Sequence, residues 1–117
     1  MNLADLSVEE RDGVVVAHVR GEIDLSNAAA IGAGVQHAVT NDSPGVVLDL
    51  TGTTYLDSAA IHAIYQLADR LRRRNQVLAI ALVEPGAAAS TLRLTGVYET
   101  VPVRTDVASA LAAVPRG

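Results

Sequence analysis

The sequence predicts an α/β domain with a mixed sheet of four to five strands that is covered by about four helices. The first observation is the pair Asp12-Gly13 between two strand-like segments, because Asp-Gly supplies the positive φ angles of a tight hairpin turn. The second is a pair of apolar runs, residues 46–50 and 77–83, separated by an amphipathic helix pattern. Such runs are typical of parallel strands buried on both faces. We therefore expect an antiparallel N-terminal hairpin followed by parallel strands with right-handed crossovers.

The first third of the chain is predicted to form this hairpin and then a helix. Residues 3–10 are expected to be a short edge strand, and residues 14–20, which are rich in β-branched side chains, its partner. A loop is expected at residues 21–24. Ser26 or Asn27 can cap a helix that continues to residue 39. The positions expected on its inner side are Ala28, Ile31, Val35, Ala38 and Val39.

The middle of the chain is predicted to be a strand, a loop and a long helix. The strand covers residues 46–50, and residues 51–54, Thr-Gly-Thr-Thr, supply the loop. Asp57 or Ser58 can accept a hydrogen bond from the free N–H groups at the start of a helix that ends near Arg74. Its apolar positions recur at helical spacing, at Ile61, Ile64, Leu67, Ala68 and Leu71.

The last third is predicted to add two strands and two helices. The apolar run 77–83 is a buried strand, and Pro85 suits the first turn of a helix at residues 86–94. Residues 101–103 form a short strand that its proline confines to an edge. Thr105 or Asp106 can cap a final helix at residues 107–114.

Composition limits the classes of function. The 117 residues suit a single domain over residues 1–117, half of them are hydrophobic, and the absence of cysteine excludes disulfides and thiol chemistry. No apolar run reaches membrane-spanning length and the N-terminus is acidic, so we expect a cytoplasmic protein without membrane insertion. The net charge of −4, with no Phe or Trp, disfavours direct nucleic-acid binding. The oligomeric state stays open.

No catalytic set emerges from the pattern of reactive residues. His18, His37 and His62 lack the short spacings of metal ligands, and no glycine-rich phosphate loop follows a strand. Asp49 lies near the end of a strand without a second reactive group beside it, so we assign it a structural role. We therefore predict no metal, no cofactor and no enzymatic activity.

Two charged or polar features have both a simple and a functional interpretation. Ser58, at the positive end of a helix, is an ordinary cap position, but a phosphate there would also face free N–H donors. The basic run at residues 70–74, Arg-Leu-Arg-Arg-Arg, suits a helix C-terminus and solubility. The same run could contact an acidic partner or a lipid headgroup.

Four motifs in order resemble the STAS domain, the fold of bacterial anti-sigma factor antagonists. Residues 21–24, Gly-Glu-Ile-Asp, match the family's GELD-type loop, and a strand at residues 46–50 precedes Tyr-Leu-Asp-Ser at residues 55–58. Residues 91–98 are similar to the family's later helix and turn. The sequence differs from many members at Ala59 and Ala60, where they have Ser or Thr and then Gly.

The resemblance implies a protein switch. In the family, the unphosphorylated domain binds an anti-sigma factor that is also a serine kinase of the GHKL type, and so releases the sigma factor. The kinase then phosphorylates the serine after the aspartate, and a PP2C-like phosphatase restores it. Carried onto this sequence, Ser58 is the phosphorylation site. The partner-binding residues are expected to be Asp24, Asp57, Ser58, His62, Tyr65 and Gln66.

A second hypothesis keeps the same surface without the switch. Some STAS domains are never phosphorylated and act as adaptor subunits of membrane lipid-transport or signalling complexes. Under both hypotheses the chain binds another protein and catalyses no reaction.

Overall fold

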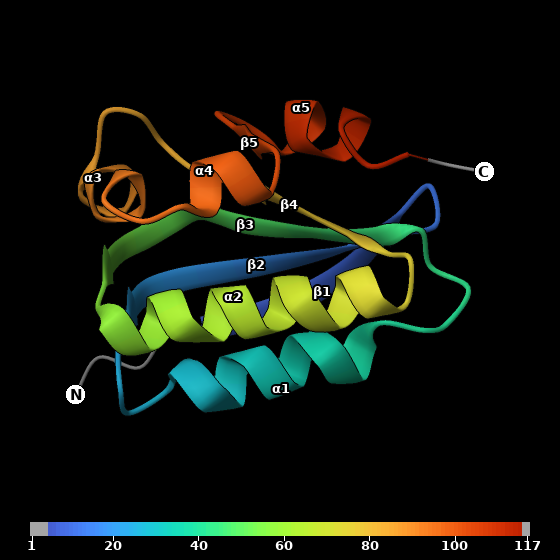
Figure 1. Ribbon diagram of the computed structural model, residues 1–117, viewed down its shortest axis with the longest axis horizontal. Helices are drawn as coiled ribbons and strands as arrows, with labels where there is room; N and C mark the ends of the chain where they lie inside the picture. The colour runs from blue at the N-terminus through green and yellow to red at the C-terminus, as the bar shows by residue number, and fades with distance from the viewer. Residues whose placement is uncertain (1–4, 116–117) are drawn as a thin grey trace.

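The computed structural model describes residues 5–115, which form one α/β domain with a five-stranded sheet in the order β1-β2-β3-β4-β5 (Figure 1). The β1–β2 pair is antiparallel and the remaining pairs are parallel, as predicted. The strands are β1 Asp5–Arg11, β2 Val14–Ile23, β3 Gly45–Leu56, β4 Val77–Ala81 and β5 Val103–Arg104. The helices are α1 Ala28–Ala38, α2 Ser58–Arg73, α3 Ala87–Arg93, α4 Val97–Thr100 and α5 Val107–Ala112.

The strand order explains which helices cover which face. Because the order of the strands never reverses, right-handed crossovers place every crossover helix on one face of the sheet. There α1 and α2 run side by side (Figure 1), and residues of α3 and α4 join the same apolar cluster. The helix α5 follows the last strand and contacts β3, β4 and β5. It forms a second, smaller cluster with Val14, Val16, Val47, Ala79 and Ala81.

The hairpin turn follows the sequence prediction. Asp12 and Gly13 have φ angles of 53° and 82°, the left-handed conformation that this two-residue turn requires. The strand β1 begins at Asp5, so the predicted start at Leu3 lies outside the described residues.

Two strands are longer than predicted. The strand β3 continues through the expected loop at residues 51–54 to Leu56, and β2 continues past Arg20 to Ile23. The two extensions pair with each other, through Glu22 with Tyr55 and Ile23 with Leu56. The prediction of a loop was wrong because three β-branched threonines suit a strand once a neighbouring strand supplies hydrogen bonds.

The C-terminal third differs in detail from the prediction. The fourth strand ends at Ala81, and Pro85 follows a cis peptide bond outside α3. The short helix α4 was not predicted, so the described residues contain five helices rather than about four. The last strand covers Val103–Arg104, and Asp106 is the residue that caps α5.

The helix α2 lies across the sheet as the amphipathic pattern predicted. Ile64, Leu67 and Leu71 are buried, Ile61 and Ala68 are half-buried, and Ala60 is buried. The first half of β3, residues 45–50, is buried on both faces, as expected of a parallel strand. None of the helices in residues 5–115 has the length and apolar character needed to span a bilayer.

Candidate functional site

One end of the sheet brings together the residues that the sequence singled out. The turns that follow β2 and β3 meet there, and we call residues 24–26 and 55–58 the loop edge. Asp57 connects the two turns: its Oδ1 accepts a hydrogen bond of 3.0 Å from the Ala60 N–H, and its Oδ2 accepts one of 3.0 Å from the Leu25 N–H. Asp57 is therefore both the cap of α2 and the anchor of the β2–α1 turn.

Hydrogen bonds also order the turn after β2. Asp24 Oδ1 accepts hydrogen bonds from the Ser26 N–H at 2.9 Å and from the Ser26 hydroxyl at 2.5 Å. These bonds hold the pKa of Asp24 below its usual value, so its carboxylate is charged at neutral pH. Asn27, a predicted cap, makes no capping bond; its side chain contacts the Glu22 carbonyl and the Asp24 N–H instead.

Two apolar side chains at the loop edge were not predicted from the sequence. Leu25 is 83% exposed and Tyr55 is 48% exposed, and with Asp24, Ser26 and Asp57 they line a shallow depression. Exposed apolar side chains grouped beside charged ones are typical of protein-binding surfaces. A leucine in an otherwise polar turn was the signal that could have revealed this surface.

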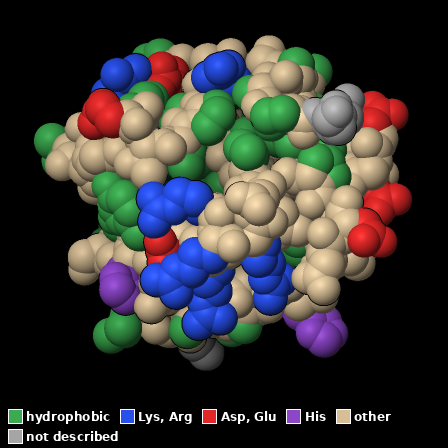
Figure 2. Space-filling model, turned by 45° about the vertical axis from the view of Figure 1, so that its right-hand side comes forward, with side chains coloured by type: hydrophobic (Ala, Val, Ile, Leu, Met, Phe, Trp, Pro, Cys, Tyr) green, Lys and Arg blue, Asp and Glu red, His purple; other side chains and the backbone are tan. Residues whose placement is uncertain are grey.

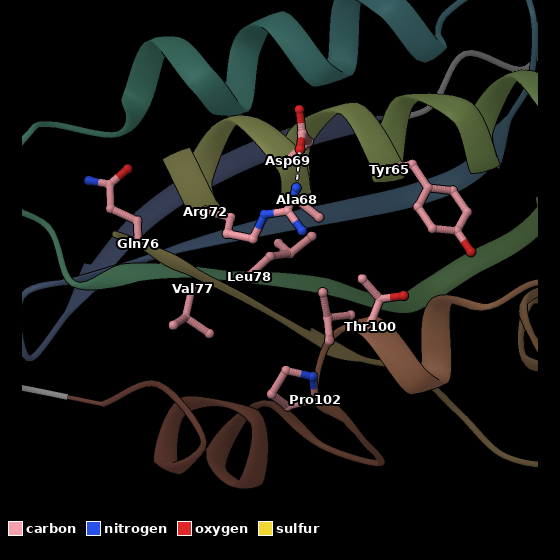
Figure 3. A pocket seen from close by; sticks show the side chains of 10 residues that line it. Tyr65, Ala68, Asp69, Arg72, Gln76, Val77, Leu78, Thr100 and Pro102 are labelled. Atoms are coloured by element: carbon pink, nitrogen blue, oxygen red, sulfur yellow. Dashed lines mark hydrogen bonds and ion pairs between the residues drawn. The ribbon is translucent and has the colours of Figure 1, made fainter. Parts of the chain in front are cut away.

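Ser58 begins α2 and is exposed. His62 and Gln66 are also exposed, one and two turns further along the helix, so they continue the surface away from Ser58. Tyr65 is half-buried and lines a groove beside α2 together with Thr100 and Pro102 (Figure 3). The structure thus brings Asp24, Asp57 and Ser58 together and leaves Tyr65 at the margin of this surface.

A second polar group lies on the sheet face that α5 leaves open. His18 Nδ1 is 2.5 Å from Asp49 Oδ2, and its Nε2 is 2.5 Å from Glu9 Oε2. Asp49 Oδ1 also accepts bonds from the N–H and the hydroxyl of Thr51, and Arg11 makes two bonds to Glu9. The predicted structural role of Asp49 agrees with these contacts, which join three strands.

The electrostatics of this group follow from its contacts. Burial lowers the pKa of His18, but hydrogen bonds to Asp49 and Glu9 outweigh it and raise the pKa above its ordinary value. Bonds from Arg11 and then His18 lower the pKa of Glu9 to about 2. Burial raises the pKa of Asp49, but bonds from Thr51 and His18 hold it below its usual value. The two carboxylates on either side of His18 therefore favour its protonated form.

The chemistry available at the loop edge is that of recognition. Within residues 5–115 no three His, Cys, Asp or Glu side chains are grouped so as to hold a metal ion. His37 and His62 are exposed on different helices. The loop edge offers charged carboxylates, two exposed apolar side chains and one exposed serine hydroxyl, which are groups that bind a protein surface and accept a modification.

The chain is similar in sequence to a known domain family and to curated proteins. The family model of the STAS domain matches residues 5–110. The chain is 28% identical to the anti-sigma-F factor antagonist RsfA of Mycobacterium tuberculosis, over 96% of this chain and 88% of that protein. It is 26% identical to the putative anti-sigma factor antagonist BtrV of Bordetella bronchiseptica, over 92% of each chain.

The chain is also similar in fold to a solved structure and, over part of its length, in sequence to a reductase. A crystal structure of an anti-sigma factor antagonist from Mycobacterium paratuberculosis superposes with a TM-score of 0.86 at 28% identity, covering 96% of this chain and 94% of that one. A stretch of 76 residues is 40% identical to a phosphoadenosine 5'-phosphosulfate reductase of Serratia proteamaculans. That stretch is 64% of this chain but only 31% of the reductase.

Proposed function

The chain belongs to the STAS domain family, and from that premise we propose that it is a cytoplasmic anti-sigma factor antagonist whose partner binding is switched by phosphorylation of Ser58. The observation that carries the proposal is the position of Ser58: exposed, at the start of α2, and directly after the aspartate that ties the two turns of the loop edge together. Asp24, Asp57, Ser58, His62, Gln66 and, at its margin, Tyr65 form the proposed partner surface.

The unmodified loop edge suits a protein partner. Leu25 and Tyr55 present apolar surface at its centre, and the carboxylates of Asp24 and Asp57 flank them. An apolar centre with charged groups beside it is the usual composition of an interface, and it favours a partner that presents basic side chains around an apolar pocket. The names of the curated relatives make an anti-sigma factor the proposed partner.

A phosphate on Ser58 would change this surface more than the fold. It would add about −1.5 to −2 charges beside the carboxylates of Asp57 and Asp24. The free N–H groups and the dipole at the start of α2 tolerate an anion, so the helix remains stable. A partner that fits the neutral hydroxyl would meet desolvation and charge repulsion, and it would dissociate.

The family resemblance supplies the remaining components of the proposed cycle. The anti-sigma factor is a serine kinase of the GHKL type, and a PP2C-like phosphatase removes the phosphate. Ser58 is then the substrate of another protein's reaction and not a nucleophile of this chain.

The test compares Ser58→Ala and Ser58→Glu for binding to the anti-sigma factor kinase that co-purifies with the tagged wild-type chain. Calorimetry is expected to show that Ser58→Ala binds like the unmodified protein and that Ser58→Glu binds at least about tenfold more weakly. Ser109→Glu is a matched control, because Ser109 lies in the first turn of α5 behind its own capping aspartate, Asp106. Equal binding by both Ser58 variants would refute the switch.

An intact-mass spectrum of the protein from its own cells separates the switch from the adaptor hypothesis. A phosphatase-sensitive mass increase that maps to Ser58 supports the switch. An unmodified protein that co-purifies with a transporter subunit supports a STAS adaptor instead.

A further inference from the structure

A groove runs beside the C-terminal half of α2, from Tyr65 to Arg72, away from the loop edge at the start of the helix. Its volume is about 250 Å³, and it lies between α2 and residues 100–102 (Figure 3). The lining is largely apolar, with Ala68 from the helix, Val77 and Leu78 from β4, and Val101 and Pro102. The groove is large enough to receive a leucine side chain.

Arginines lie at the C-terminal end of α2, beside this groove. Arg72 lies on its rim, where its Nη2 is 2.5 Å from Asp69 Oδ1, and Arg73 contacts the other oxygen of Asp69 at 2.9 Å. Arg70 and Arg74 are exposed on the same helix end but lie toward α1, where the Arg70 guanidinium donates a hydrogen bond of 2.9 Å to Gln36 Oε1. Figure 2 shows a group of basic side chains on the surface. Four arginines against one aspartate leave an excess of positive charge, which favours an acidic occupant.

The loop edge of this chain has the complementary chemistry. Leu25 extends from it and is 83% exposed. The carboxylates of Asp24 and Asp57 lie in the same two turns, and Glu22 precedes them near the end of β2. Residues 21–28 and 53–60 contain no Lys or Arg. Hydrogen bonds to Asp57 and Asn27 hold the turn in place, so little conformational entropy is lost when it binds.

We propose that the groove binds the Asp24–Leu25 tip of a second copy of this chain, with Leu25 in the groove and Asp24 facing Arg72. Arg72 lies 14 residues beyond Ser58, about 21 Å along α2, so Asp24 of one copy cannot face its own Arg72. The charges at the two ends of α2 steer the copies into this arrangement. The contact is small, and we expect it to be weak and sensitive to salt.

This contact also has a consequence that, unlike the contact itself, rests on the proposed function. The tip that enters the groove belongs to the proposed partner surface. Self-association would therefore compete with the anti-sigma factor. At high protein concentration it would lower the amount of free monomer that can bind the anti-sigma factor.

The experiment is sedimentation of the purified full chain at protein concentrations up to about 1 mM, in about 0.05 M and about 0.5 M salt. We expect the average mass to rise with concentration at low salt and to fall toward the monomer at high salt. Leu25→Ser and Arg72→Glu are each expected to weaken association at least about tenfold. Leu94→Ser and Arg20→Glu are matched controls at other exposed positions and should behave as the wild type.

A mixture of the two variants gives the sharper result. Leu25→Ser retains the groove and Arg72→Glu retains the tip, so the mixture is expected to form a pair of one copy each and nothing larger. If the wild type is a monomer throughout, or if both variants associate as it does, the proposal is wrong. Binding of the monomeric wild type to anionic vesicles would assign the arginines to a lipid surface and would also overturn it. Neither test involves Ser58 or an anti-sigma factor, so failure here leaves the proposed function standing.

Discussion

The two faces of the sheet are built by different means. On the face of α1 and α2, one apolar cluster extends from Val15 to Val97 and includes Val46, Leu48, Leu50 and Leu56 of β3. On the other face, α5 covers only part of the sheet, and the strands beyond it meet through Glu9, His18 and Asp49. The first face depends on burial and is insensitive to pH, whereas part of the second depends on charged hydrogen bonds.

The comparison is tested most strongly by removing apolar volume from each face. Leu50, 1% exposed, lies in the larger cluster, and Leu50→Ala is expected to lower the free energy of unfolding by about 2–5 kcal/mol. Val16→Ala, in the cluster under α5, removes fewer atoms and should cost about 1–3 kcal/mol. Urea unfolding measures both. An equal or larger loss for Val16→Ala would contradict the ranking of the two faces.

Removal of the cap that joins the loop edge to α2 is expected to have the next largest effect on the free energy of unfolding. Asp57→Ala removes hydrogen bonds to two N–H groups on different elements and should cost about 1–2 kcal/mol. Asp106→Ala removes a cap that serves α5 alone and should cost about 0.5–1 kcal/mol. Urea unfolding of the two variants gives this difference. If the two losses are the same, the bond from Asp57 to Leu25 contributes nothing to stability.

The pH dependence of stability tests whether the second face of the sheet depends on the charge of His18. Because the pKa of His18 is raised in the folded state, its protonated form stabilises the fold. This contribution is fully present below the unfolded pKa, about 6.5, and is lost as pH rises through the raised folded value. The facing groups, Glu9 and Asp49, have lowered pKa values and stay ionised over this range.

The measurement is urea unfolding of the wild type and of His18→Gln at several pH values between about 6 and about 9. The wild type is expected to lose stability as pH rises, with a smaller loss in His18→Gln. His37→Gln is the control, because His37 is exposed on α1. A wild type and a His18→Gln variant with parallel pH profiles would show that the two carboxylates do not hold a charged imidazole.

The fold was largely predictable because its periodic signals are local. The spacing of Ile64, Leu67 and Leu71 identifies the buried stripe of α2, and Asp12-Gly13 identifies the hairpin. The extensions of β2 and β3 were not predictable, because each exists only as the other's partner. The four-residue helix α4 is too short to show a period.

The candidate site was predictable in part for the same reason. The position of Asp57 and Ser58 directly before a helical pattern identifies them as cap residues. The contact between Asp57 and Leu25 joins residues from two separate turns, and nothing local to either turn indicates it. His18 likewise gives no sign in the sequence that carboxylates from β1 and β3 lie on both sides of its ring.

The strand order β1-β2-β3-β4-β5 also has a consequence for biosynthesis. Each strand that leaves the ribosome after the first finds its neighbour already made, so no strand has to insert between two others. The amphipathic face of α1 is available to β2 before β3 emerges, and α2 then meets a sheet that already has three strands. Translation from the N-terminus therefore presents the elements in the sequence in which they can pack.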